Sequence, residues 1–269
     1  MNFMRWQKGR GTKYSLRPFC PLTKTQTKDR DIMTELTVVL VHGAFAESAS
    51  WNGVIAALQN EGLSAIATPN PLRSVTTDAD NVRRAIEAVG GPVVLVGHSY
   101  GGAVITEAAV GSDAVKGLVY VSAFAPDHGE TSLGLTDKFP GSTLGETVRA
   151  IPLGDGTNDL IVDRELFPHQ FCGDVALADA KIAAATQRAV RDFALAEPQP
   201  AAIPAWKLLP SWFVFGSADR NIPAESLRFM ADRAGSLKTV EIEGSSHSSM
   251  VSNPSVVAGL ILEAVAHLS

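Results

Sequence analysis

Residues 93–102, VVLVGHSYGG, constrain the fold of this chain more than any other stretch. Four apolar residues stop at a glycine, which is typical of a short strand buried on both faces. The segment 101–110 that follows has a helix-like pattern. Ser99 therefore lies in a sharp Gly-x-Ser-x-Gly turn between strand and helix, and such a turn raises the serine Oγ above a sheet. Because a serine hydroxyl is a poor nucleophile until a base takes its proton, the motif requires a histidine nearby.

Short apolar runs alternate with helical patterns along most of the chain. Strands are predicted at residues 36–41, 64–68, 93–97, 118–122, 212–215 and 239–242. Helices are predicted around residues 51–58, 82–89, 101–110, 224–234 and 255–268. Strands that alternate with helices pair in parallel through right-handed crossovers, and helices cover both faces of the sheet. The sequence thus predicts an α/β fold with a six-stranded, mainly parallel sheet.

Residues 126–210 do not follow this alternation. The segment is rich in Pro and Gly, and its clearest helical pattern covers residues 175–195. A structureless insert of this length would be unusual in a compact domain. We therefore expect a helical cap, inserted after the fourth strand, over the carboxyl ends of the strands, where open α/β sheets bind ligands. The core then consists of residues 33–125 and 211–269.

Residues 1–32 form a basic extension, with eight of the 23 Lys and Arg residues and only two acids. The extension has no apolar run of secretory length, and no stretch of the sequence reaches transmembrane length. Its Arg-rich, acid-poor start loosely resembles an organelle transit peptide. The interpretation that we favour over a transit peptide is a disordered extension upstream of a domain that starts at Met33. In either case we expect residues 1–32 to be dispensable for the chemistry.

The net charge of −5 does not indicate nucleic acid as a partner, and without a stretch of transmembrane length we expect no membrane partner. Cys20 and Cys172 form neither a disulfide framework nor a metal-ligand pattern, which fits two ordinary thiols in the reducing cytoplasm. No group of His, Asp and Glu has metal-ligand spacing, so we expect no metal. The sequence leaves a monomer and a homodimer open.

The partners of the serine are expected later in the chain, in the order acid and then histidine. Asp219 follows the fifth strand and His247 follows the sixth, so both lie at the same sheet edge as Ser99. His247 would accept the serine proton, and Asp219 would fix its tautomer and stabilise the imidazolium. Asp127, just past the fourth strand, is a rival for the role of the acid.

An oxyanion that forms during acyl transfer needs preorganised N–H donors. We expect the backbone amide of Tyr100, next to the nucleophile, and that of Ala44, in the loop after the first strand. The substrate pocket is predicted to be mainly apolar, with side chains from core and cap: Phe45, Phe124, Leu133, Leu135, Phe139, Phe171 and Met250. For the cap residues, plain packing between cap and core is an equally good interpretation.

These features together resemble the α/β-hydrolase superfamily over residues 34–269. They are HGAF at 42–45, Ser50-Trp51, the VLVGHSYGGAV turn, GSADR and the late His247. The chain is most similar to small bacterial serine carboxylesterases and is related to the plant methylesterase and hydroxynitrile lyase group. The resemblance implies an α/β-hydrolase fold with an inserted cap, and ester hydrolysis through an acyl-enzyme without a cofactor.

The resemblance also separates the possible reactions. Haloalkane dehalogenases and epoxide hydrolases of this fold carry an aspartate where this chain has Ser99. Plant cyanohydrin lyases have a lysine after the catalytic histidine and a threonine after the first histidine, where this chain has Ser248 and Gly43. Among the triad residues, only Asp219 has an immediate Lys or Arg neighbour, Arg220, so a neutral ester with a compact acyl group fits best. A lyase or perhydrolase using the same triad, and a ligand sensor with little turnover, are the alternatives.

Overall fold

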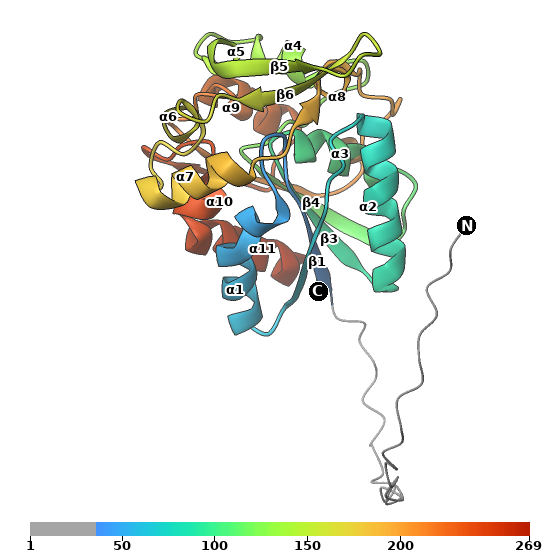
Figure 1. Cartoon of the computed structure of the whole chain (residues 1–269). Coiled ribbons are helices and arrows are strands. Elements are labelled where there is room, and N and C mark those ends of the chain that lie inside the picture. Colours follow the sequence, from blue (N-terminus) through green and yellow to red (C-terminus); the bar gives the residue numbers. More distant parts are fainter. Residues whose placement is uncertain (1–35) are drawn as a thin grey trace, which may run out of the picture. The chain divides into compact units, whose positions relative to one another are not determined.

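Six parallel strands form the central sheet of the computed structural model, which describes residues 36–269 (Figure 1). Their order is β2-β1-β3-β4-β8-β9. The strands are β1 (Thr37–Val41), β2 (Ser64–Thr68), β3 (Val93–His98), β4 (Val115–Val121), β8 (Ser211–Gly216) and β9 (Lys238–Ile242). The structure therefore confirms the predicted six-stranded parallel sheet. The extension predicted over residues 1–32 lies outside the described residues.

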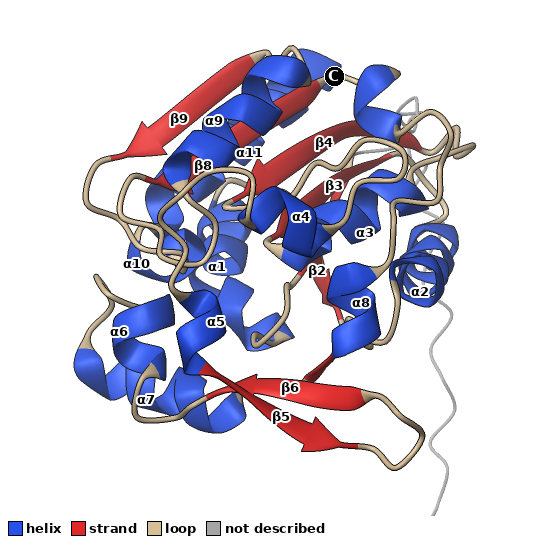
Figure 2. Ribbon diagram, turned by 90° about the horizontal axis from the view of Figure 1, so that it is seen from above, coloured by secondary structure: helices blue, strands red, loops and turns tan. Residues whose placement is uncertain are grey.

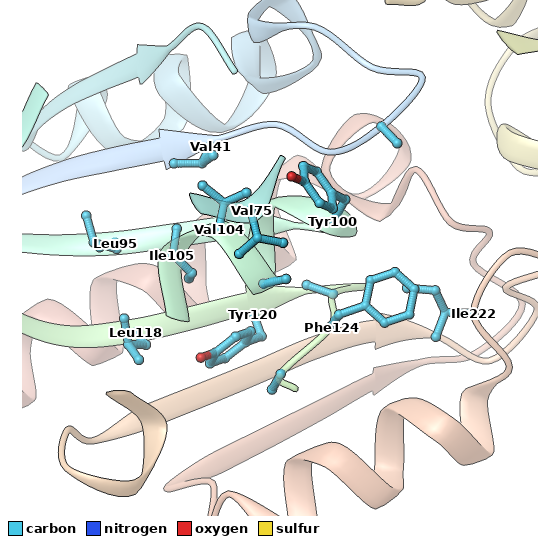
Figure 3. Close-up of a cluster of buried hydrophobic side chains, with 14 of the residues drawn as sticks. Val41, Val75, Leu95, Tyr100, Val104, Ile105, Leu118, Tyr120, Phe124 and Ile222 are labelled. Carbon is cyan, nitrogen blue, oxygen red and sulfur yellow. The ribbon is translucent and has the colours of Figure 1, made fainter. Parts of the chain in front are cut away.

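Helices cover both faces of this sheet. One face packs against α1 (Asn52–Asn60) and α11 (Pro254–Leu268), and the other against α2 (Val75–Val89), α3 (Tyr100–Ala108) and α9 (Ala224–Arg233). Along β3, Val94 and Val96 belong to the hydrophobic cluster on the face of α1 and α11. Val93 and Leu95 belong to the cluster on the opposite face, part of which Figure 3 shows. Both faces are thus buried at the inner strands, which explains why β1, β3 and β8 are nearly continuous apolar runs.

The segment between β4 and β8 forms the cap. Its helices are α4 (Ser132–Thr136), α5 (Leu144–Thr147), α6 (Phe167–Phe171), α7 (Leu177–Thr186), α8 (Asp192–Ala196) and the 3₁₀ helix η2 (Ala205–Lys207). It also contains an antiparallel sheet, β5-β6-β7, built from Val148–Pro152, Asn158–Val162 and Val190–Arg191 (Figure 2). The predicted helical cap therefore also contains a small sheet, which the sequence did not indicate. Most of β5 is exposed, so it lacks the buried alternation that identifies a strand in a sequence.

The remaining short helices flank the sheet edge at which the strands end. The 3₁₀ helix η1 (Ser48–Trp51) follows the loop after β1, and α10 (Ser249–Ser252) follows the loop after β9. The cap lies beyond the carboxyl ends of the central strands, as Figure 1 shows. This arrangement brings the loops after β1, β3, β8 and β9 together under the cap.

Candidate active site

Ser99 occupies the turn between β3 and α3 with a backbone φ of 53°, in the left-handed region that a residue with a Cβ rarely adopts. Its neighbours hold it there, because its N–H donates to Val121 O at 3.2 Å and its carbonyl accepts from Phe124 N at 3.1 Å. A side chain at Gly101 would place a Cβ 2.5 Å from Val41 O, so the turn needs glycine there. The strained turn is thus built into the packing of β1, β3 and α3.

His247 and Asp219 form a buried pair at the same sheet edge. His247 Nδ1 lies 2.7 Å from Asp219 Oδ2, and the two side chains are 1% and 0% exposed. The other carboxylate oxygen, Oδ1, accepts from the backbone N–H groups of Asn221 and Ile222 at 2.8 and 2.9 Å. An ionised carboxylate only accepts hydrogen bonds, so Nδ1 carries the proton and Nε2 is the basic nitrogen. Within residues 36–269, His247 Nε2 has no hydrogen-bond partner.

A second histidine holds the first in place. His98 Nε2 lies 3.1 Å from the carbonyl oxygen of His247, and the two ring centroids are 4.7 Å apart. Burial, and then the neighbouring His247, lower the pKa of His98 well below its usual value. His98 is therefore neutral and donates its Nε2 proton to that carbonyl. The ring of Phe171 packs edge-on against His247, with centroids 4.7 Å apart.

A cavity of about 520 Å³ contains both Ser99 and His247. Of the predicted pocket residues, Phe45, Phe124, Leu133 and Phe171 line it. The sequence did not indicate most of the cap residues that line the cavity, nor two lining residues in the loop after Asp219. These lining residues are Thr143, Leu144, Val148, Ala150, Leu160, Leu195, Asn221 and Ile222.

Three predicted pocket residues do not line this cavity. Leu135 lies on α4 and is buried, and its carbonyl accepts a hydrogen bond from Ser226 Oγ. Phe139 packs on Phe229 with ring centroids 5.9 Å apart. Met250 is buried with the cluster under α11 and borders a different hollow. Leu135 and Phe139 thus pack against α9 and not against the cavity.

The two predicted oxyanion donors lie beside the nucleophile. Ala44 lines the cavity, and Tyr100 is the first residue of α3. Neither backbone amide donates to an acceptor among the residues that the structure describes. The loop that carries Ala44 passes so close to the turn that a Cβ on Gly43 would lie 2.6 Å from Ser99 Cβ.

The rival acid, Asp127, lies elsewhere. Both of its carboxylate oxygens accept from Lys207 Nζ at 2.7 Å, and its side chain is 31% exposed. In the described part of the chain, the only carboxylate paired with His247 belongs to Asp219.

The cavity wall carries two acids, Asp137 and Glu146, and none of its described residues is Lys or Arg. The described residues contain no group of three His, Cys, Asp or Glu side chains that could hold a metal ion. Nor does any helix over residues 36–269 have the length and apolar character that a membrane span needs.

Comparisons with known proteins agree with this architecture. The model of the alpha/beta hydrolase family matches residues 38–260. An alpha-hydroxynitrile lyase of Arabidopsis thaliana is 25% identical over 80% of this chain and 92% of its own length. A carbendazim hydrolyzing esterase of Nocardioides is 37% identical, but the match covers only 37% of this chain and 47% of that enzyme.

Solved structures show the same fold at lower identity. The crystal structure of polyneuridine aldehyde esterase is 19% identical, with a TM-score of 0.72 over 86% of this chain and 99% of its own. Because the family model spans most of the sequence, and the central sheet has the predicted parallel strands, the chain belongs to the alpha/beta hydrolase family.

Proposed function

We propose that this protein is a serine hydrolase that cleaves small, mainly apolar carboxylic esters through an acyl-enzyme. The observation that carries the proposal is the combination of Ser99 and His247 in one cavity with a buried carboxylate, Asp219, on His247 Nδ1. Each group then has one role: Ser99 is the nucleophile, His247 the base and Asp219 the group that orients the base.

The reaction proceeds in two acyl-transfer steps. Ser99 Oγ attacks the ester carbonyl while His247 Nε2 takes the hydroxyl proton, and the carbonyl oxygen becomes an oxyanion facing the amides of Ala44 and Tyr100. The C–O bond to the leaving group then breaks, and His247 returns the proton to the departing alkoxide. Water attacks the acyl-enzyme by the same route and releases the carboxylic acid.

The composition of the cavity wall supports a neutral substrate. Phe45, Phe124, Leu133 and Phe171 supply apolar surface near the reacting groups. With Asp137 and Glu146 on the wall and no Lys or Arg among its described residues, a carboxylate-bearing ester would be repelled. Two of the similar proteins named above are esterases by name, in accord with this class.

A lyase is the second candidate, because one relative that matches most of this chain is an alpha-hydroxynitrile lyase. Splitting a cyanohydrin releases cyanide, and a nearby cation would stabilise that anion as it forms. Ser248 follows His247, and the described cavity wall contains no lysine. Ester hydrolysis therefore fits the site better than cyanohydrin cleavage.

The test is a panel of p-nitrophenyl acetate, butyrate and octanoate, with mandelonitrile as the lyase substrate. We expect turnover of the short esters, loss of that turnover in Ser99→Ala, and no cyanide release above the uncatalysed rate. Cyanide release without ester turnover would replace the esterase by a lyase. Stoichiometric binding of the esters with no turnover would indicate a ligand sensor.

A further inference from the structure

Asp78 is a buried carboxylate that the proposed reaction does not use. It lies in the first turn of α2, on the apolar side that also carries Val75, Ala79 and Val82, and is 0% exposed. Burial raises its pKa, although hydrogen bonds from the backbone of Arg73 and from Tyr100 oppose this effect. A carboxylate in such a place costs stability unless its partners compensate, so the partners indicate its role.

The first partner is the residue next to the nucleophile. Tyr100 is fully buried, and its hydroxyl donates to Asp78 Oδ2 at 2.9 Å. Its backbone N–H is one of the two proposed oxyanion donors. The bond to Asp78 therefore fixes the far end of a side chain whose main chain faces the reacting carbonyl, and it ties the start of α3 to α2.

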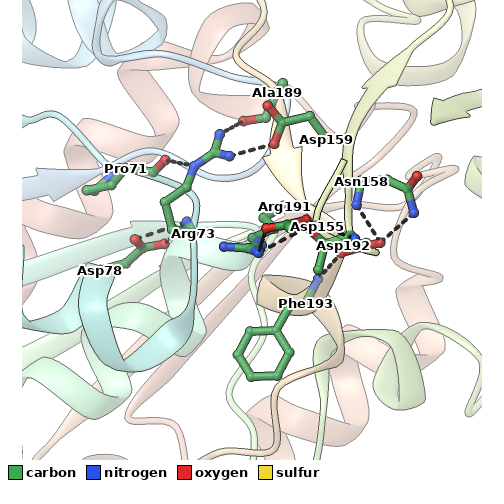
Figure 4. A network of polar contacts seen from close by, with 11 residues as sticks. Pro71, Arg73, Asp78, Asp155, Asn158, Asp159, Ala189, Arg191, Asp192 and Phe193 are labelled. Atoms are coloured by element: carbon green, nitrogen blue, oxygen red, sulfur yellow. Dashed lines mark hydrogen bonds and ion pairs between the residues drawn. The ribbon is translucent and has the colours of Figure 1, made fainter. Parts of the chain in front are cut away.

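The second partner links Asp78 to the cap. The backbone N–H of Arg73 lies 3.2 and 3.1 Å from the two oxygens of Asp78. The Arg73 side chain reaches the other way: Nη1 lies 2.5 Å from Asp159 Oδ1 on β6, and Nη2 donates to Ala189 O at 3.1 Å (Figure 4). The residue after Asp159 is Leu160, which lines the cavity with Ser99.

We propose that Asp78 and Arg73 are positioning residues for the reaction, Asp78 by fixing Tyr100 beside the nucleophile and Arg73 by fixing the cap strand β6 that walls the substrate cavity. This inference rests on the proposed esterase function. The two contacts meet at one short segment, residues 73–78, but they act on different parts of the site. The hydroxyl of Tyr100 affects stabilisation of the oxyanion, which exists only during the reaction. The guanidinium of Arg73 affects substrate binding.

The two roles predict different kinetic effects. Loss of the Tyr100 hydroxyl loosens an oxyanion donor and should lower kcat with little change in KM. Loss of the Arg73 guanidinium lets β6 and Leu160 shift and should raise KM with little change in kcat. A merely structural role would lower the melting temperature of either variant without this separation.

Tyr100→Phe tests the first role, with Tyr120→Phe as the matched control. Tyr120 is also fully buried, and its hydroxyl bonds to Thr106 Oγ1 at 2.8 Å, outside the cavity wall. With p-nitrophenyl butyrate, and active sites counted by a fluorophosphonate, we expect kcat to fall about 10-fold in Tyr100→Phe and to change less than about twofold in Tyr120→Phe. Equal kcat values per labelled site in the two variants would overturn the role of Asp78.

Arg73→Gln tests the second role, with Arg228→Gln as the control, because Arg228 pairs with Glu241 in an exposed ion pair remote from the cavity. Since the Arg73 pair is partly exposed, we expect KM to rise about 3-fold in Arg73→Gln and not in Arg228→Gln. In Arg73→Lys, which keeps a positive charge, the rise in KM should be smaller than in Arg73→Gln. An unchanged KM in Arg73→Gln would overturn the role of Arg73. If either of these results were found while the fluorophosphonate still labelled Ser99 fully in Tyr100→Phe and Arg73→Gln, the esterase proposal would stand.

Discussion

Asp219→Asn is the substitution for which the structure gives the most specific expectation. Oδ1 of Asp219 accepts two backbone N–H groups, from Asn221 and Ile222, at 2.8 and 2.9 Å. In the asparagine variant the amide oxygen must take this place, because an NH₂ group there would face two donors. The NH₂ group is then directed at His247 Nδ1, which lies 2.7 Å from the present Oδ2.

The consequence is a reversed tautomer. His247 Nδ1 can only accept from the new amide, so the ring proton moves to Nε2, and Nε2 can no longer take the proton of Ser99. The expected loss in kcat is about 10³- to 10⁴-fold near neutral pH. Folding should change little, because both backbone hydrogen bonds to residue 219 remain.

The assay is hydrolysis of p-nitrophenyl butyrate by Asp219→Asn and Asp127→Asn, measured together. Asp127 is bonded to Lys207 at the surface, so its variant should lose less than about 1 kcal/mol of stability and keep its activity. Near-normal kcat in Asp219→Asn with a crippled Asp127→Asn would refute this reasoning and move the acid to the end of β4.

Further predictions concern packing, the pocket and pH. Gly43→Ala should destabilise the fold by about 1–3 kcal/mol in urea unfolding and reduce activity, because the new Cβ would lie 2.6 Å from that of the turn serine; unchanged values would contradict the close approach. Leu133→Ala should raise KM for apolar esters about 3-fold, whereas Phe139→Ala, outside the cavity, should not; the reverse pattern would show that the cavity wall is wrongly assigned. Burial lowers the pKa of His42 from 6.5 to about 4, and that of His98 well below 6.5. Since the unfolded chain binds protons that the folded protein excludes, unfolding free energy should fall from pH 6.5 towards 4, by ~1.4 kcal/mol per pH unit for each imidazole. A urea midpoint that does not fall between pH 7 and 5 would contradict this.

The parts of the fold that the sequence predicts are those in which one local pattern determines the outcome. The inner strands β1, β3, β4 and β8 are largely apolar, and all six central strands were predicted within three residues of their observed bounds. The order of Ser99, Asp219 and His247 along the chain placed them at one sheet edge, and the structure pairs the last two. Whether these residues act as a triad stays a prediction until it is measured.

The cap was less predictable, because its conformation depends on contacts between distant segments. Strand β5 is mostly exposed, and the predicted helical stretch 175–195 is divided into α7 and α8 by residues 187–191, which include β7. The orientation of Leu135 and Phe139 follows from how the cap docks on the core, which no local pattern encodes.

The position of Asp78 in the sequence is itself a signal of a buried acid. Asp78 lies on the same side of α2 as Val75, Val82 and Ile86, at the spacing that marks a buried helix face. An acid at such a position requires a buried partner, and the structure supplies the hydroxyl of Tyr100.

The most direct test of Ser99 as the nucleophile is labelling with a fluorophosphonate, followed by peptide mass spectrometry and combined with the kinetics of Ser99→Ala. We expect one adduct per chain, on the peptide that contains Ser99. We also expect a loss of kcat of about 10³- to 10⁶-fold in Ser99→Ala at an unchanged melting temperature. An adduct on a different serine, or a Ser99→Ala variant that keeps most of its ester turnover, would contradict the assignment of the nucleophile.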